Sequence, residues 1–218
     1  MRLSVVIPTL NAARTLPDCV ARIGDADETI VVDGGSTDDS VRIAEVAGAR
    51  LVIAPRGRGA QLRAGGEAAR GHWLLFLHAD TQLGAGWRKA VELHFSSHPQ
   101  SAACFRFRLD DAAWQARCVE HGVAARVRLL SLPYGDQGLL VSREHYAKVG
   151  GYRPMPLMED VDLVRRLGKV RMLPVDAVTS AARWRCDGWV RRSARNLLCL
   201  GLYGLGWSPE RIARTYRG

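Results

Sequence analysis

Polar and charged residues that could bind a phosphorylated ligand follow four hydrophobic stretches in the first eighty residues. The four groups are Pro8-Thr9-Leu10-Asn11, Asp33-Gly34-Gly35-Ser36-Thr37-Asp38, Arg56-Gly57-Arg58-Gly59 and His78-Ala79-Asp80. An aspartate in the second group can accept hydrogen bonds from a base or a ribose. Arginines beside flexible glycines suit a phosphate or a base edge. Asp80 could hold a divalent metal ion, Mn2+ or Mg2+, that bridges a diphosphate.

Each group also has a purely structural interpretation. Asp33-Gly34-Gly35 is a common turn sequence, and Arg56–Gly59 could be a solvated loop. His78–Asp80 could be the end of a strand followed by a helix cap. We favour a ligand site because all four groups occupy the same place relative to successive hydrophobic stretches.

The hydrophobic stretches read as β-strands that alternate with helices. The predicted strands are Leu3–Ile7, Glu28–Val32, Leu51–Ile53 and Trp73–Leu77, and the predicted helices run from Thr15 to Ile23, from Ser36 or Thr37 to Ala47, and from Ala60 to Ala69. A strand without polar residues, such as the fourth, belongs in a parallel sheet covered on both faces. This order predicts an α/β fold with an open parallel sheet, whose ligand crevice lies at the carboxyl ends of the strands.

The pattern becomes less regular after Asp80. We expect helices over Trp87–His98, Glu159–Leu167 and Trp189–Leu205, a last helix opened by Ser208-Pro209, and strands over Cys104–Leu109 and Leu139–Ser142. The chain shows neither an internal repeat nor a low-complexity linker, so we expect a single domain.

Positive charge is concentrated at the end of the chain. The 218 residues carry a formal net charge of +9, and residues 183–218 hold eight arginines against two acids, a net +6. Such a segment attracts phosphate groups in a nucleic acid, an anionic lipid or a diphosphate substrate, and it also fits a solvated basic helix.

The five cysteines contain no CxxC pair, which favours reduced thiols and a cytoplasmic protein. The longest charge-free apolar run, Leu197–Trp207, is shorter than the roughly 20 residues that span a bilayer. We therefore expect a cytoplasmic protein, with peripheral attachment to the inner face of the membrane as an option.

Several motifs, in order, resemble those of the family 2 glycosyltransferases. They are Val5-Val6-Ile7-Pro8-Thr9-Leu10-Asn11, Val31-Val32-Asp33-Gly34-Gly35-Ser36-Thr37-Asp38, Leu75-Phe76-Leu77-His78-Ala79-Asp80, Val149-Gly150-Gly151-Tyr152 and Met158-Glu159-Asp160-Val161-Asp162-Leu163. With Pro133-Tyr134-Gly135-Asp136-Gln137-Gly138, the chain looks like a compact bacterial branch without membrane spans. Ordered motifs over residues 2–170 are more specific than any one of them.

The resemblance implies a GT-A fold, an open, mostly parallel sheet with helices on both faces. It implies one domain over residues 1–218. About residues 1–100 would form a Rossmann-like half that binds the nucleotide-sugar, about 101–182 the acceptor and catalytic half, and about 183–218 basic amphipathic helices. The implied reaction moves a sugar from a nucleotide-diphosphate donor to an acceptor hydroxyl, with inversion and with the help of a metal ion. A lipid-linked acceptor is one option.

Roles follow for single residues that match the family's motifs. The resemblance implies a nucleotide-binding set of Pro8, Thr9, Asn11, Asp33, Gly34, Arg58, Arg63, His78 and Ala79. Asp80 matches the last, metal-binding position of the Asp-x-Asp motif, whose first position holds His78 here. Asp160 matches the catalytic base of inverting members, and Glu159 would orient the loop. Gly135, Asp136 and Gln137 would lie near the donor sugar or the acceptor.

Four other classes of protein are alternatives. A nucleotidyltransferase would carry a glycine-rich phosphate loop after the first strand, where Pro8–Asn11 stands. A dinucleotide-dependent oxidoreductase needs GxGxxG there, and Gly57-x-Gly59 follows the third strand instead. A basic nucleic-acid-binding protein would explain the charge but leaves the acids at the strand ends without a role. A catalytically inactive relative that binds nucleotide-sugar would fit the histidine at position 78.

Overall fold

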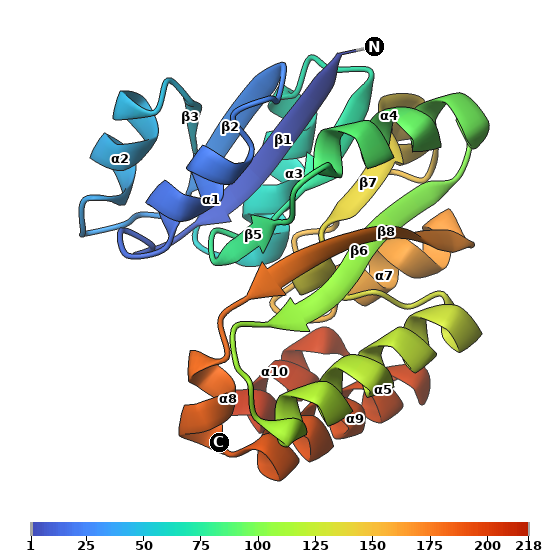
Figure 1. The fold of residues 1–218 in the computed structure, drawn as a ribbon. Coiled ribbons are helices and arrows are strands. Elements are labelled where there is room, and N and C mark those ends of the chain that lie inside the picture. The colour runs from blue at the N-terminus through green and yellow to red at the C-terminus, as the bar shows by residue number, and fades with distance from the viewer. Residues whose placement is uncertain (1, 218) are drawn as a thin grey trace.

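The computed structural model describes residues 2–217, and its first half confirms the predicted parallel sheet. Strands β1 (Leu3–Thr9), β2 (Glu28–Asp33), β3 (Arg50–Ile53) and β4 (Trp73–Phe76) are parallel, in the order β3-β2-β1-β4. Helices α1 (Leu16–Arg22), α2 (Ser40–Val46) and α3 (Arg58–Ala68) connect them (Figure 1). The carboxyl ends of β1, β2 and β4 therefore lie side by side, as the sequence predicts.

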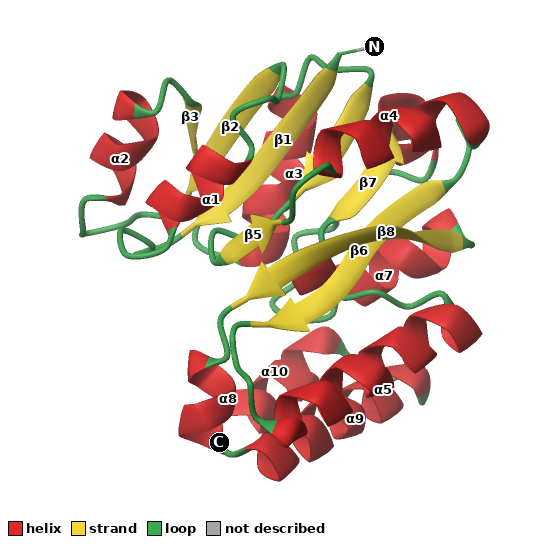
Figure 2. Ribbon diagram, viewed as in Figure 1, coloured by secondary structure: helices red, strands yellow, loops and turns green. Residues whose placement is uncertain are grey.

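Antiparallel strands extend the sheet beyond β4. Strand β7 (Leu139–Ser142) is antiparallel to β4, and β6 (Ala102–Leu109) is antiparallel to β7. Strand β8 (Val170–Thr179) runs parallel to β6, and β5 (Thr81–Leu83) is antiparallel to β8. The result is one mixed eight-stranded sheet in the order β3-β2-β1-β4-β7-β6-β8-β5 (Figure 2).

Apolar side chains alternate between the two faces of the sheet. In β1, Leu3, Val5 and Ile7 belong to a core with helices α1 and α4 (Trp87–Ser97), whereas Val6 faces the opposite core with α3. In β4, Leu74 lies in that second core, with helices α6 (Arg143–Lys148) and α7 (Glu159–Leu167). Both faces are covered, which explains why these strands are almost entirely apolar.

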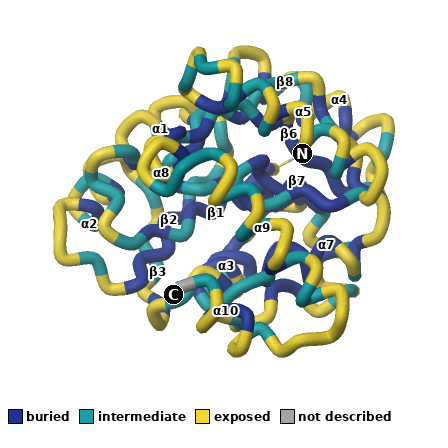
Figure 3. The backbone as a smooth tube through the Cα atoms, turned by 90° about the horizontal axis from the view of Figure 1, so that it is seen from below, coloured by how far each residue is buried: buried dark blue, intermediate teal, exposed yellow. Residues whose placement is uncertain are grey.

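Four helices form a separate layer beyond the carboxyl ends of β6 and β8. They are α5 (Trp114–Leu130), α8 (Ala182–Asp187), α9 (Trp189–Gly204) and α10 (Pro209–Arg217) (Figure 1). Exposed residues cover much of the outer side of this layer (Figure 3). Within residues 2–217 no helix combines the length and the hydrophobicity needed to cross a membrane.

The sequence analysis did not predict α5, α6, α8, β5 or β8. In α5 the exposed side chains of Trp114, Leu129 and Leu130 interrupt the pattern that an amphipathic helix would show. In β8, Pro174 lies inside the strand and its side chains do not alternate strictly between buried and exposed.

Candidate functional site

The first turn of α7 holds two neighbouring acids, one of which, Asp160, lines a cavity. Met158, directly before the helix, adopts the left-handed conformation with φ of 67°. Glu159 and Asp160 follow, and they are 1% and 6% exposed. The positive N-terminal end of a helix dipole stabilises carboxylates, and at this position it partly offsets the cost of burying them.

Asp160 is held from three directions. Its Oδ2 accepts a hydrogen bond from the backbone N–H of Gly135 at 3.0 Å, and its Oδ1 accepts one from the Tyr152 hydroxyl at 3.2 Å. The guanidinium of Arg58 lies 3.5 Å from Oδ2. These contacts fix the orientation of the carboxylate and leave lone pairs on both oxygens for a further donor.

Arg58, from the first turn of α3, also forms a closer ion pair with Glu159. Burial lowers the pKa of the Arg58 guanidinium, but the charges of Glu159 and Asp160 outweigh this effect and raise it. Burial raises the pKa of Glu159, although Arg58 opposes the change. Arg58, predicted to contact nucleotide, is thus engaged as the counter-charge of the acid pair.

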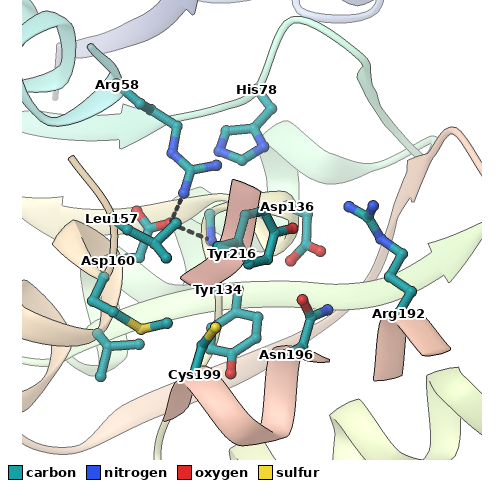
Figure 4. Close-up of a pocket in the computed structure, with 13 residues that line it drawn as sticks. Arg58, His78, Tyr134, Asp136, Leu157, Asp160, Arg192, Asn196, Cys199 and Tyr216 are labelled. Atoms are coloured by element: carbon teal, nitrogen blue, oxygen red, sulfur yellow. Dashed lines mark hydrogen bonds and ion pairs between the residues drawn. The ribbon is translucent and has the colours of Figure 1, made fainter. Parts of the chain in front are cut away.

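A cavity of about 120 Å3 opens beside Asp160. Its wall combines residues from the sheet, the 134–136 turn, the start of α7 and the last two helices. They are Arg58, His78, Tyr134, Gly135, Asp136, Leu157, Met158, Asp160, Val161, Arg192, Asn196, Cys199 and Tyr216. Figure 4 shows Arg58 and His78 on one side of this cavity and Asn196 and Cys199 of α9 on the other.

Three polar atoms of residues in the cavity wall are buried without a hydrogen-bond partner among the described residues. They are Nε2 of His78, Oδ1 of Asp136 and Nε of Arg192. Burial raises the pKa of Asp136 to about 6. Burial, followed by the charge of Arg58, lowers the pKa of His78 to about 4, so the ring is neutral at pH 7. Leaving such atoms unpaired is costly, so water or a polar ligand in the cavity is needed to pair with them.

Only glycine fits at position 135. A Cβ there would lie 2.5 Å from Nε2 of His78 and 2.7 Å from Oδ2 of Asp160. The neighbouring Gln137 is fully buried, and its side-chain amide donates to the carbonyl of Phe105 at 3.1 Å. Gln137 therefore holds the turn in place, whereas Gly135 and Asp136 face the cavity.

The predicted nucleotide side is a set of linked loops at the ends of β1 and β2. Asp33 is 3% exposed, and its Oδ2 accepts hydrogen bonds from the backbone N–H groups of Gly35 and Ser36 at 2.8 and 2.9 Å. Asn11, with φ of 51°, accepts a hydrogen bond from the backbone N–H of Thr37 at 2.8 Å. These contacts show that Asp33 and Asn11 stabilise the loops.

Gln61 of α3 ties the ends of β1 and β2 together. Its side-chain amide donates to the carbonyls of Thr9 and Val32 at 2.7 and 2.8 Å. A Cβ at Gly34 would lie 2.9 Å from this amide, so the glycine allows the close approach. Pro8 is paired with Val32 within the parallel ladder.

Asp80 lies in the turn after β4, as predicted, directly before β5 and beside the buried Ala79. Its backbone carbonyl lies 3.5 Å from the hydroxyl of Thr179, and none of the described residues forms a hydrogen bond or ion pair with its carboxylate. No group of three or more His, Cys, Asp or Glu residues within residues 2–217 could hold a metal ion alone. One carboxylate nevertheless fits an ion that also binds substrate phosphates, the usual arrangement for Mg2+.

Arg63 lies away from this assembly. It forms an i,i+4 ion pair with Glu67 at 2.9 Å, and it lines a different pocket with Tyr146, Gly150 and Gly151. The structure therefore separates Arg63 from the other predicted nucleotide-binding residues.

Sequence reasoning missed several residues that complete the site. Tyr152 is 1% exposed and bonds Asp160, and the motif Val149–Tyr152 was its only sequence signal. Arg192, Asn196 and Cys199 reach the cavity from α9 at intervals of four and three residues. This spacing places them on one helix face, but the basic tail gave no reason to connect that face with the cavity.

The structure thus combines a parallel sheet whose polar loops gather at its carboxyl edge with a buried aspartate beside a cavity, and that edge is where open α/β sheets bind their ligands. The sequence profile of "Glycosyl transferase family 2" matches residues 4–121. The chain belongs to this family.

Two kinds of mycobacterial relative match part of the chain. A PGL/p-HBAD biosynthesis glycosyltransferase of Mycobacterium bovis (strain BCG / Pasteur 1173P2) is 42% identical over 92 residues, which cover 37% of this chain and 36% of the relative. An uncharacterized glycosyltransferase of Mycobacterium tuberculosis (strain ATCC 25618 / H37Rv) is 38% identical over 84 residues, 38% of either chain. The match spans little more than a third of the length of these relatives.

Solved structures show the same fold. Residues 1–349 of S. aureus TarS, in complex with UDP-GlcNAc, superpose with a TM-score of 0.64 at 15% identity, covering 82% of this chain and 59% of that one. Glucosyl-3-phosphoglycerate synthase from Mycobacterium tuberculosis, in complex with Mn2+, UDP and phosphoglyceric acid, gives a TM-score of 0.58 at 20% identity, with 82% and 69% covered. At these identities the likeness establishes the GT-A fold.

Proposed function

We propose that this protein transfers a sugar from a nucleotide-diphosphate donor to an acceptor hydroxyl with inversion at the anomeric carbon. The observation that carries the proposal is the Asp160 carboxylate. It is buried, oriented by Gly135 and Tyr152, and open to a cavity that contains unpaired polar atoms. Family membership and the complexes of structural neighbours with UDP-GlcNAc and UDP support a nucleotide-sugar donor.

Asp160 acts as the general base in this mechanism. An acceptor hydroxyl gives its proton to the carboxylate while its oxygen forms a bond to the anomeric carbon, and the bond from that carbon to the diphosphate breaks. Gly135 and Tyr152 keep the carboxylate oriented, and Arg58 with Glu159 fixes the start of α7. A divalent ion at Asp80, when bound, would neutralise charge on the departing diphosphate.

The two halves divide the substrates between them. About residues 1–100 bind the nucleotide, with Pro8, Thr9, Asn11, Asp33, Gly34, His78 and Ala79 shaping that side. About residues 101–182 bind the acceptor and hold the catalytic pair, and about residues 183–218 close the cavity with α9 and α10.

Asp160→Asn tests the role of the base because it keeps the shape of the side chain and removes its basicity. We expect kcat to fall by about 10²–10⁴ while donor binding stays near normal. Glu159→Gln should lower kcat less, because Glu159 touches Arg58 and lies outside the cavity wall.

NMR of the product should show an anomeric configuration opposite to that of the donor. Full turnover by Asp160→Asn, or a retained configuration, would contradict the mechanism. Nucleotide binding without any turnover in the wild type would instead favour an inactive relative.

We also propose that the C-terminal layer attaches the enzyme to an anionic membrane surface. Val190, Leu197, Leu198 and Leu205 of α9 and its C-cap are 82%, 64%, 54% and 79% exposed. Their spacing places them within one arc of about 100° on the helix. An exposed apolar stripe beside arginines, here Arg191, is typical of helices that lie in a lipid interface. A peripheral position of this kind also suits a lipid-linked acceptor.

A further inference from the structure

The hydroxyl group of Tyr146, in α6, supports the segment that leads to Asp160. Tyr146 is 6% exposed, and its Oη accepts a hydrogen bond from the backbone N–H of Tyr152 at 3.0 Å. The side chain of Tyr152 in turn donates its hydroxyl hydrogen to Oδ1 of Asp160 at 3.2 Å. Two consecutive hydrogen bonds therefore connect α6 with the carboxylate that lines the cavity.

Two glycines determine where the Tyr146 hydroxyl lies. A Cβ at Gly66 of α3 would lie 2.6 Å from Oη of Tyr146, and a Cβ at Gly151 would lie 2.8 Å from its Cζ. Neither distance leaves room for a side chain, so the phenol ring is enclosed between two stretches of backbone. Gly151 also adopts a φ of 62°, a conformation that favours glycine. A ring enclosed in this way holds its hydroxyl group in one place.

The ring of Tyr152 bridges the space between Tyr146 and Asp160. It is 1% exposed and packs edge-on against Phe76, with the ring centroids 4.9 Å apart and the planes at 81°. Its backbone is bonded by Tyr146 and its hydroxyl by Asp160. Because a densely packed interior transmits small displacements, a shift of the backbone at Tyr152 would move the hydroxyl that contacts the carboxylate.

Tyr146 has a place in this arrangement that no other described residue shares. Arg166 holds the same turn through the carbonyls of Val149 and Gly151, but among the described residues only Tyr146 accepts a hydrogen bond from the N–H of Tyr152. Tyr146 is not part of the cavity wall beside Asp160, and it lines the separate pocket that contains Arg63. It therefore acts at a distance from the ligands of that cavity.

We propose that Tyr146 is a positioning residue, which sets the orientation of the Asp160 carboxylate through Tyr152. Without the Tyr146 hydroxyl, the N–H of Tyr152 loses its partner, and the turn before α7 shifts. The catalytic meaning of this contact rests on the proposed function, in which Asp160 is the general base. The contact itself can be measured without a substrate, because the backbone N–H of Gly135 donates to the other oxygen of Asp160, Oδ2, at 3.0 Å.

Tyr146→Phe keeps the ring and removes only the hydroxyl. In amide NMR spectra we expect the Gly135 signal to shift, and its hydrogen exchange to become about threefold or more faster, because its bond to Asp160 weakens. Tyr152→Phe should change Gly135 at least as much. Adding Tyr146→Phe to Tyr152→Phe should change it little further, because the hydroxyl that transmits the effect is already absent.

Tyr203→Phe is the matched control. The Tyr203 hydroxyl lies 3.5 Å from Oδ1 of Asp162, an acid of the same helix α7, so its removal should leave Gly135 as in the wild type. An unchanged Gly135 signal in Tyr146→Phe, an equal change in Tyr203→Phe, or additive effects of Tyr146→Phe and Tyr152→Phe would each overturn the proposal. Circular dichroism confirms that every variant is folded.

Turnover of UDP-glucose and UDP-GlcNAc in the presence of Mn2+ connects the contact with catalysis. For a donor that the wild type turns over, Tyr146→Phe should lower kcat about tenfold at an unchanged KM, since a misplaced base slows the chemical step. A higher KM with an unchanged kcat would assign Tyr146 to donor binding and contradict the proposal. If the wild type neither binds UDP nor releases it from either donor, the proposed function fails, and the response of Gly135 alone decides whether Tyr146 positions Asp160.

Discussion

Single carboxylates in this protein have distinct environments, and their expected behaviour differs accordingly. Asp160 is fixed by three contacts, Asp136 is half-buried with a buried and unpaired Oδ1, and Asp33 is bonded within its own turn. Asp80 has no partner among the described residues. The residue type alone thus says little about its role, and the partners of each carboxylate are what distinguish them.

Asp80→Ala should weaken the binding of UDP in the presence of Mn2+ and barely change it when a chelator is present. The reason is that Asp80 would be the protein's ligand to a metal ion that otherwise binds the diphosphate, and the variant removes this ligand. Isothermal titration calorimetry under both conditions measures the difference. Equal loss of affinity with and without metal, or no loss at all, would remove Asp80 from the metal site.

Asp136 should leave a signature in the pH dependence of stability. Burial raises its pKa from 3.8 to about 6 in the folded state, so the folded chain holds this proton more tightly than the unfolded chain does. Ionisation between about pH 4 and pH 6 therefore lowers the free energy of unfolding. The wild type should lose stability relative to Asp136→Asn as the pH rises through this window, and the difference should be constant above it.

Urea unfolding of both proteins at several pH values measures that difference. Comparing the two proteins cancels the contributions of other carboxylates, such as Asp187, whose pKa the hydrogen bond from Arg192 lowers. Parallel stability curves from pH 4 to pH 7 would show that Asp136 is not buried in the way described.

At the scale of elements, Arg58 of α3 is paired with both acids in the first turn of α7. Arg58 is the partner of Glu159; the Arg58 side chain is 41% exposed and that of Glu159 is 1% exposed. Removing one partner of a fully buried pair costs about 3–5 kcal/mol, but water screens a half-exposed arginine, so the loss should be smaller, about 1–3 kcal/mol. Arg58→Met should therefore lower the free energy of unfolding by an amount of that order, and adding Glu159→Gln should recover part of the loss.

The same helix offers a matched control. Arg63 pairs with Glu67, but both side chains are more than half exposed, at 53% and 63%. Exposed pairs contribute about 0–1 kcal/mol, so Arg63→Met should be nearly neutral. Denaturant unfolding of the three variants decides the matter. An equal effect of Arg58→Met and Arg63→Met would mean that the first pair does not stabilise the start of α7.

The elements that the sequence predicted well share strong local signals. Strands β1 to β4 are short, apolar and closed by turn residues, and α7 and α9 begin and end within a residue or so of the predicted positions. Strand β8 contains a proline, and its pairing with β6 has a bulge-like irregularity. Both features obscure the alternation of buried and exposed side chains that would mark a strand. Helix α5 carries apolar residues on its exposed side as well as its buried side.

The site was predictable where it follows from strand order and unpredictable where it depends on tertiary contact. Asp80 and the loops after β1 and β2 lie where the parallel order requires. The ion pair between Arg58 and Glu159 joins residues 101 positions apart, and Tyr216 reaches the cavity from the far end of the chain. Nothing in the local sequence marks such long-range partners.

For the whole molecule, attachment to a membrane surface can be tested through α9. We expect the protein to co-sediment with vesicles that contain anionic lipid at low salt, and much less with neutral vesicles. The double variant Leu197→Glu/Leu198→Glu should abolish binding, because it places two charges on the exposed apolar arc. Val46→Glu, at an 80% exposed position on α2, is the control and should bind normally. Binding that is independent of anionic lipid, or insensitive to the α9 variant, would contradict the proposal.

The two faces of α9 would serve different ligands if both proposals hold, and this arrangement has a thermodynamic consequence. One face supplies Arg192, Asn196 and Cys199 to the cavity, while the other exposes Leu197 and Leu198. If vesicle binding shifts or rigidifies this helix, the affinity for the acceptor changes by some factor. Reciprocity of binding free energies then requires that a bound acceptor change the affinity for the vesicle by the same factor. The lipid surface would act as an effector of the enzyme as well as its location.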